Sequence, residues 1–113
     1  MHPVDAAVAA PLCTSIVDLR KHEGAPIRVG GTFHFPGEKA FARNKLILDD
    51  GTTVSLSRPA RQPVAAMLSE ANRGVRMIIV GVVYIKDIPA RYQLIGRTSD
   101  PYLVDIESVT VAP

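Results

Sequence analysis

The sequence predicts a single, mainly β domain of five strands, with one helix between the third and fourth strands and a short helix before the first. Three observations predict this fold. Apolar and polar residues alternate in segments of strand length, one segment has the apolar spacing of an amphipathic helix, and clusters of Gly, Pro and Asp separate the segments. The chain has 113 residues, of which 47% are hydrophobic, and this size fits one globular domain.

The composition limits the classes of function. Thirteen Lys and Arg against eleven Asp and Glu give a net charge of +2, so an electropositive site must come from local placement of cations. The single cysteine, Cys13, excludes an internal disulfide framework and the usual structural zinc patterns, and it favours a cytoplasmic location. No apolar run reaches the roughly 18 residues of a membrane-spanning helix, so we expect a soluble protein without a membrane partner.

The chain begins with an expected tail and a short helix. Residues 1–12 are rich in Ala and Pro and have no periodic polar face, which predicts a flexible tail before a domain over residues 13–113. Ser15 and Asp18 have the spacing of a capping box, and Gly24 suits the left-handed residue that ends a helix. We therefore expect a helix from Ser15 to about His22.

The first strand is expected from Pro26 to Phe35. Along this segment one face carries apolar residues and the other carries polar ones, as in a half-buried strand. The neighbouring glycines Gly30 and Gly31 leave no side chains to crowd the backbone, so the strand can bend sharply there. The inner face is expected to hold Ile27, Val29, Gly31, Phe33 and Phe35.

The segment from Asn44 to Ser57 predicts a hairpin whose turn follows from matching faces. A two-residue turn at Asp50 and Gly51 would place Lys45 opposite Leu56. A three-residue turn over 49–51, with Gly51 left-handed, instead gathers the apolar residues inside, and it is preferred. The inner residues are then Leu46, Leu48, Val54 and Leu56, and the outer ones are Arg43, Lys45, Ile47, Thr53, Ser55 and Ser57.

The second half of the chain predicts one helix and two strands. A helix of about ten residues starts at Pro63, and the apolar segment 75–86 predicts a central strand with Gly81 at its middle. Residues 92–95 are a candidate extra strand. The last strand runs from Tyr102 to about Val111, with Tyr102, Val104 and Ile106 on one face and a bulge near Ser108.

This order of elements, with bends at glycines, resembles the oligonucleotide/oligosaccharide-binding (OB) fold, a five-stranded Greek-key barrel. In style the chain is similar to small single-stranded-nucleic-acid-binding OB proteins. The resemblance implies a ligand surface on the outer face of the second and third strands, flanked by two loops. Carried onto this sequence, that surface holds Lys39, Phe41, Arg43, Lys45, Ser55, Arg91, Tyr92 and Arg97, with Glu38, Asp87 and Asp100 at its margins.

Three functions remain open at this point. The basic residues could hold phosphates of single-stranded nucleic acid, with Phe41 and Tyr92 stacking on bases or else packing over the barrel; Tyr84 and Tyr102 are the other rings in reach. Alternatively, an apolar strip of the fourth strand could dock a protein partner or a second copy of the chain. That strip comprises Ile78, Val80 and Val82. A small-molecule or saccharide ligand is the third class.

No pattern in the chain points to an enzyme or a cofactor. The sequence contains no phosphate-binding loop, dinucleotide fingerprint or nucleophile elbow. Asp49 and Asp50 precede Gly51 between two strands, where they are turn formers first. His22, His34 and Cys13 lie on separate elements without ligand spacing, so we expect no metal site. The chemistry expected is binding.

Overall fold

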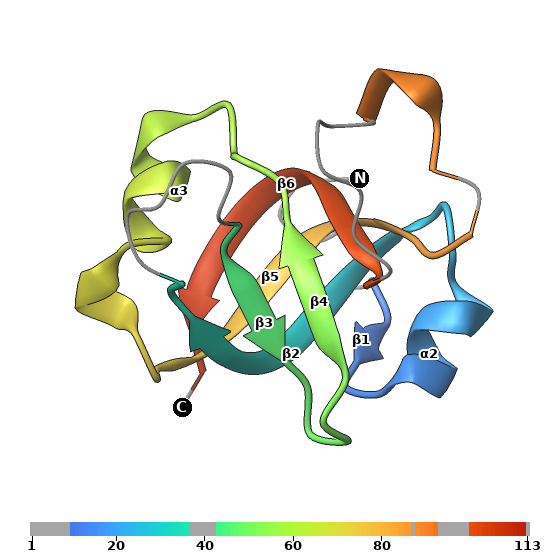
Figure 1. The fold of residues 1–113 in the computed structure, drawn as a ribbon, viewed down its shortest axis with the longest axis horizontal. Helices are drawn as coiled ribbons and strands as arrows, with labels where there is room; N and C mark the ends of the chain where they lie inside the picture. The colour runs from blue at the N-terminus through green and yellow to red at the C-terminus, as the bar shows by residue number, and fades with distance from the viewer. Residues whose placement is uncertain (1–9, 37–42, 87, 93–99, 113) are drawn as a thin grey trace.

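The computed structural model describes residues 10–36, 43–86, 88–92 and 100–112. Within this part the protein is mainly β, as predicted, with strands, two α-helices and two short 3-10 turns (Figure 1). The strands are β1 (Leu12–Cys13), β2 (Pro26–His34), β3 (Lys45–Ile47), β4 (Thr53–Leu56), β5 (Arg76–Tyr84) and β6 (Tyr102–Val111). The helices are α2 (Ile16–Lys21) and α3 (Gln62–Met67), and the 3-10 turns are Glu70–Asn72 and Ala90–Tyr92.

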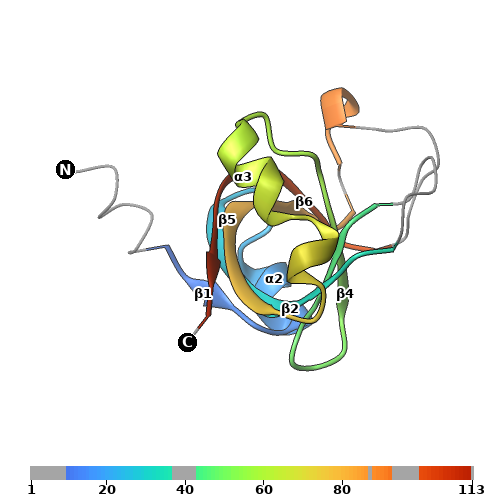
Figure 2. The same ribbon diagram turned by 90° about the vertical axis from the view of Figure 1, so that its left-hand side faces the viewer.

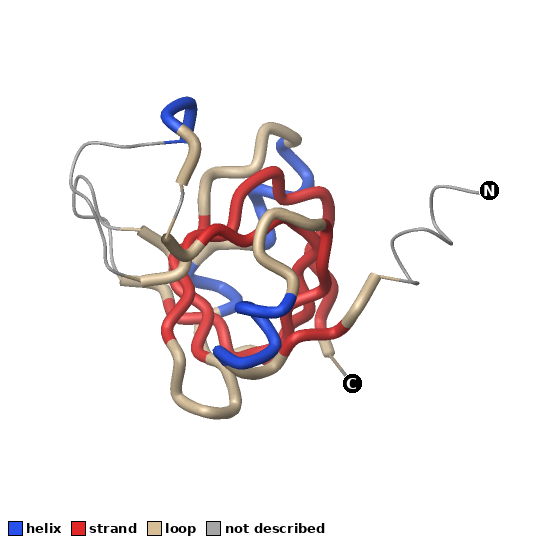
Figure 3. The backbone as a smooth tube through the Cα atoms, turned by 90° about the vertical axis from the view of Figure 1, so that its right-hand side faces the viewer, coloured by secondary structure: helices blue, strands red, loops and turns tan. Residues whose placement is uncertain are grey.

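The strands form one six-stranded mixed sheet instead of the five strands expected. Its order is β1-β2-β3-β4-β6-β5, and β2 also pairs with β5. The β1–β2 and β4–β6 pairings are parallel, and the other pairings are antiparallel. Figures 2 and 3 view the sheet from its two sides and show it curving strongly, with α3 toward the viewer in one and α2 in the other.

The additional strand is β1, which takes in Leu12, the last residue of the expected tail. β3 pairs only with the end of β2, from Thr32 to His34. The earlier part of the same edge would be left open, and β1 pairs there with Arg28 and Val29. The Arg28 backbone N–H donates to the Pro11 carbonyl at 2.9 Å. The chain thus covers a strand edge that would otherwise be exposed.

The hairpin of β3 and β4 has the predicted three-residue turn. Leu46 stands opposite Val54, and the Leu48 N–H donates to the Thr52 carbonyl at 2.9 Å. Gly51 has the left-handed φ of 88° that this turn requires. The four apolar residues expected inside are all buried in the core, so face matching identified the register correctly.

The turn of this hairpin is fastened to the rest of the molecule by two carboxylates. Asp50 accepts the Ile16 backbone N–H at the start of α2 and the Thr52 N–H of its own turn, each at 2.9 Å and through different oxygens. These hydrogen bonds lower the pKa of the Asp50 carboxyl. Asp49 forms an ion pair with Arg76 of β5 at 2.9 Å.

The core contains residues from every strand and from both helices. The helix expected from Ser15 forms as α2, with the Ser15 hydroxyl accepting the Asp18 N–H at 3.2 Å, and it buries Leu19 completely. α3 contributes Val64, and Leu68 follows it. The cluster of buried residues is Cys13, Leu19, Ile27, Val29, Phe33, Leu46, Leu48, Val54, Leu56, Val64, Leu68, Met77, Ile79, Val83, Leu103 and Ile106.

The predicted helix after Pro63 is wrong in length, because the structure has the six residues of α3 followed by a separate 3-10 turn. The helix ends at Met67, and the capping residue that follows it, Leu68, has non-helical φ and ψ of −95° and 63°. The side-chain amide of Asn72 donates to the Met67 carbonyl at 2.7 Å, and that of Asn44 donates to the Leu68 carbonyl at 3.3 Å. These amides satisfy carbonyls that a longer helix would have bonded internally.

The predicted bulge in the last strand is present, but it lies earlier than Ser108. Val80 of β5 stands opposite Ser108 and Val82 opposite Val104, so three residues of β6 face the single residue Gly81. Asp105 has a positive φ of 51° within this bulge. The expectation that Tyr102, Val104 and Ile106 share one face is therefore wrong. Leu103 and Ile106 belong to the main core cluster, whereas Tyr102 and Val104 are buried outside it.

Two glycines allow neighbouring backbones to approach closely where the sheet bends. A Cβ atom on Gly31 would lie 2.5 Å from the Ile47 carbonyl oxygen, and one on Gly81 would lie 2.8 Å from the Val104 carbonyl oxygen. A Cβ atom on Gly30 would meet only side-chain atoms, the nearest at 3.6 Å, which is ordinary contact. The bend thus needs glycine at position 31 and not at position 30.

We predict that Gly31→Ala destabilises the protein by about 1–3 kcal/mol, because the added methyl group pushes β2 away from β3. Gly30→Ala is the matched control and should change the free energy of unfolding by much less. Urea unfolding followed by circular dichroism measures both. Equal effects of the two substitutions would contradict the close approach at Gly31.

We also predict a pH dependence for the Asp50 fastening. Because the folded state lowers the pKa of Asp50 below its ordinary value of 3.8, the contribution to stability is complete above that value and is lost as pH falls through the folded pKa. Asp50→Asn keeps one acceptor oxygen of two, so it should lower the urea midpoint near pH 7 and lower it less near pH 3. A difference from the wild type that does not change with pH would refute the stabilising role of the ionised Asp50 carboxylate. Asp49→Asn is the control, because it makes the same substitution at the neighbouring aspartate of the turn.

Candidate functional site

The strand register brings four residues into a row across the outer face of the sheet. Lys45 of β3 stands opposite Ser55 of β4, Ser55 stands opposite Tyr102 of β6, and Tyr102 stands opposite Tyr84 of β5. Directly opposed residues share a face of a sheet, and their side chains touch. We call these four residues the transverse row.

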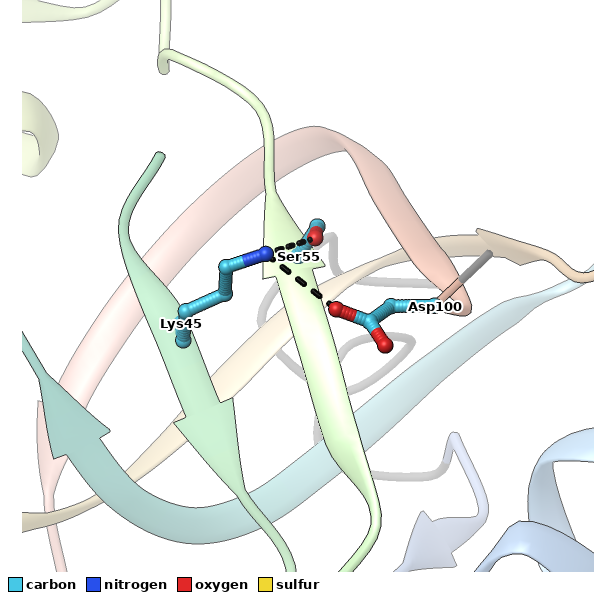
Figure 4. A network of polar contacts seen from close by, with 3 residues as sticks. All are labelled: Lys45, Ser55 and Asp100. Atoms are coloured by element: carbon cyan, nitrogen blue, oxygen red, sulfur yellow. Dashed lines mark hydrogen bonds and ion pairs between the residues drawn. The ribbon is translucent and has the colours of Figure 1, made fainter. Parts of the chain in front are cut away.

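One end of the transverse row is a polar cluster (Figure 4). The Lys45 ammonium donates to the Ser55 hydroxyl oxygen at 2.8 Å and pairs with an Asp100 carboxylate oxygen at 3.2 Å. Ser55 is fully buried, whereas the side chains of Lys45 and Asp100 are 23% and 32% exposed. The Ser55 backbone N–H donates to the Pro101 carbonyl at 2.8 Å, so the chain next to Asp100 is held against β4.

The middle of the transverse row is aromatic. Tyr102 is only 5% exposed, and its burial raises the pKa of its hydroxyl, while the nearby charge of Arg43 partly opposes that rise. The Arg43 guanidinium lies over the Tyr102 ring, 5.7 Å from the ring centre. This distance is within the range of a cation–π interaction. A cation from the segment before β3 is therefore held on a ring from β6.

The other end of the transverse row is extended by Tyr92, which lies in the 3-10 turn after β5. The rings of Tyr84 and Tyr92 have centres 5.9 Å apart and are tilted by 31°. The Tyr92 hydroxyl donates to an Asp105 carboxylate oxygen at 2.6 Å, and the Arg91 guanidinium lies 4.7 Å from the centre of the Tyr92 ring. The hydrogen-bonding interaction with Tyr92 raises the pKa of Arg91 further above its already high value.

Five of the residues that the sequence assigned to a site lie in or beside the transverse row. Arg43, Lys45 and Ser55 are at its β3–β4 end, and Arg91 and Tyr92 are at its β5 end. Lys39, Phe41 and Arg97 lie outside the described residues. Of the candidate extra strand over residues 92–95, only Tyr92 is described, and it belongs to a 3-10 turn.

Sequence reasoning named Tyr84 and Tyr102 as rings in reach of the ligand surface, but it did not place them in one row with Lys45 and Ser55. The expected ligand face on β3 and β4 carries no aromatic residue, but β5 and β6 supply two rings beside it. One signal could have found them. Tyr84 and Tyr102 flank the loop that joins two strands expected to be neighbours, and residues at the two ends of such a loop face each other across an antiparallel pair.

Two kinds of feature are absent from the described residues. No group of three or more His, Cys, Asp or Glu side chains in that part of the chain could hold a metal ion. Among the helices of the same part, none has the length and apolar character needed to cross a membrane.

Burial, with a smaller effect from Asp18, raises the pKa of the Cys13 thiol, and a raised pKa makes a thiol less reactive.

We predict that Ser55→Ala lowers the free energy of unfolding by about 1–2 kcal/mol, because it removes a buried acceptor from a largely covered ammonium group. Ser57→Ala, two residues further along and on the same face, is the matched control and should have a smaller effect. Urea unfolding of both variants checks the prediction. If Ser55→Ala is as stable as the wild type, the Lys45–Ser55 contact does not stabilise the folded protein.

No protein-family model matches this chain, and a search of curated proteins found no significant match. The chemistry of Arg43, Lys45 and the three tyrosines therefore carries the inference about function.

Proposed function

We propose that this chain is an OB-type barrel that binds single-stranded nucleic acid with little sequence specificity, through the transverse row together with Arg43, Arg91 and Tyr92. The pairings of the sheet support the barrel. From β2 they run to β3, β4, β6 and β5, and the β2–β5 pairing leads back to β2. With α3 between β4 and β5, this order matches a five-stranded Greek-key barrel to which β1 is added.

The observation that carries the proposal is the alternation of rings and cations on one surface. Arg43 lies over Tyr102, Tyr84 lies beside Tyr92, and Arg91 lies over Tyr92. Stacking on a ring stabilises binding by about 1–3 kcal/mol per base, whichever base it is. Guanidinium groups bind phosphate oxygens, which are the same along any strand. Such a surface favours single strands, because only unpaired bases expose their faces.

The rings differ in how they could meet a base. Tyr102 is almost fully covered, so its part is to support Arg43 and to fix the centre of the row. Tyr84 and Tyr92 are partly exposed, and they are the rings on which bases would stack. Arg91 is exposed beside them and can reach the phosphate that follows a stacked base.

The proposal is a binding protein and not an enzyme. The only neighbouring pair of aspartates, Asp49 and Asp50, is occupied with structural contacts to Arg76 and to the Ile16 and Thr52 backbone. The hydrogen bonds of Asp50 lower the pKa of its carboxyl, and this opposes a role as a general acid.

A titration of a labelled oligonucleotide of about 20 nucleotides, followed by fluorescence anisotropy, tests the proposal. Three to five phosphate contacts predict a slope of log K against log salt of about −2 to −3.5 for single strands. Arg43→Ala combined with Arg91→Ala should abolish most of the binding. The control is Arg73→Ala combined with Arg76→Ala, which removes the same charge at the opposite end of β5 and should leave most of the affinity.

The outcomes separate the candidate functions. No binding at low salt with micromolar protein would overturn the proposal. Equal losses in the two double variants would mean that the net charge, and not the transverse row, decides binding.

A second candidate function is docking of a protein partner or of a second copy, and one observation favours it. Leu12 of β1 is 46% exposed, and its side chain lies over Gly30 close to Ile78 of β5. The apolar strip expected on β5 is only partly open, since Val80 is buried while Ile78 and Val82 are half-buried. Self-association in sedimentation velocity, together with absent oligonucleotide binding, would favour this function.

A further inference from the structure

We propose that Asp100 is an internal competitor for phosphate: its carboxylate occupies, in the free protein, the position on Lys45 that a backbone phosphate takes in the complex. This inference rests on the proposed function and concerns how its binding surface is regulated. It assigns a phosphate subsite to Lys45, with Ser55 as the residue that positions the ammonium group and Asp100 as the group that leaves.

The geometry of the cluster supports a fixed position for the ammonium group. An ammonium group has three N–H donors, and Lys45 directs one to the buried Ser55 hydroxyl and one to Asp100. The Ser55 contact comes from the neighbouring strand at the directly opposed position. The Lys45 ammonium therefore stays at this point of the surface when its anionic partner changes.

The geometry also makes Asp100 the partner that can leave. Asp100 is more exposed than Lys45, with 32% of its side chain accessible against 23%, and it lies two residues before Tyr102, the first residue of β6. Because Asp100 lies outside the strands, rotation of its short, partly exposed side chain would release Lys45 while the backbone pairings of the sheet stay in place. Water still reaches this partly exposed ion pair and competes with it, so an incoming phosphate can replace the Asp100 carboxylate.

Carboxylate and phosphate are alternative ligands of the same cation, since both offer anionic oxygens at similar distances. They cannot both lie against Lys45 without bringing two negative charges together, and like charges at such a distance repel. Competition from Asp100 therefore lowers the affinity of the protein for a strand. The effect is largest at low salt, where each phosphate contact contributes most to affinity.

Asp100→Asn tests this directly in the anisotropy titration. The carboxamide is nearly the same size but carries no charge, so the variant should bind the oligonucleotide about two- to fivefold more tightly at low salt. Its slope of log K against log salt should become steeper by up to about 0.7, the value of one additional phosphate contact on a single strand.

The matched control is Asp49→Asn. It makes the same change of charge, and Asp49 is also in an ion pair, with Arg76, but it lies in the turn at the other end of the β3–β4 hairpin from Lys45. It should raise affinity much less than Asp100→Asn does. Equal gains in the two variants would overturn the inference, because they would come from net charge alone.

A double variant links the gain to Lys45. In the presence of Lys45→Gln, Asp100→Asn should no longer increase affinity, since the competed cation is absent. Asp100→Ser provides a second way to remove the charge, and circular dichroism confirms that each variant is folded. A gain that persists without Lys45 would overturn the inference.

The remaining outcomes distinguish this inference from the proposed function. If the wild type binds and both Asp100 variants bind equally well with the same salt slope, the internal competition is refuted and the nucleic-acid-binding function stands. If neither the wild type nor the Asp100 variants bind at low salt, both are refuted.

Discussion

The structure depends on the pairing of β2 along both of its edges. One edge is shared by β1 and β3, and the other edge is taken by β5 over almost the whole length of the strand. Pairing with three strands brings neighbouring backbones close to β2, and the absence of a side chain at Gly31 permits this beside Ile47. Gly81 plays the same part where β5 meets the bulge of β6.

Much of this fold could be predicted from local patterns. Alternation located β2, the long apolar run located β5, face matching identified the turn at Asp49 to Gly51, and the capping pattern at Ser15 located α2. The errors arise where distant residues intervene. Asn44, which lies far from α3 in sequence, helps to end that helix, and β1 forms because β3 is too short to cover the edge of β2. A single sequence does not show which chain segment will reach such a place.

The candidate site was predictable only in part, for a related reason. Lys45 and Ser55 follow from the outer face of one hairpin, where register is a local matter. Tyr102 joins them through the parallel pairing of β4 with β6, which brings together residues 47 positions apart, from 55 to 102. No periodicity marks such a pairing. Asp100 was expected at the margin of the site, but its pairing with Lys45 and the contact of Asp105 with Tyr92 depend on where the distant β6 segment lies.

The distribution of aromatic residues has a consequence for spectroscopy. The chain contains no tryptophan and three tyrosines, and all three lie at the transverse row or stack against it. The phenylalanine Phe33, by contrast, is buried in the core. When the unlabelled protein is excited in the tyrosine absorption band, its fluorescence therefore comes almost entirely from this one surface. The molecule carries its own optical reporter at the place where a ligand would arrive.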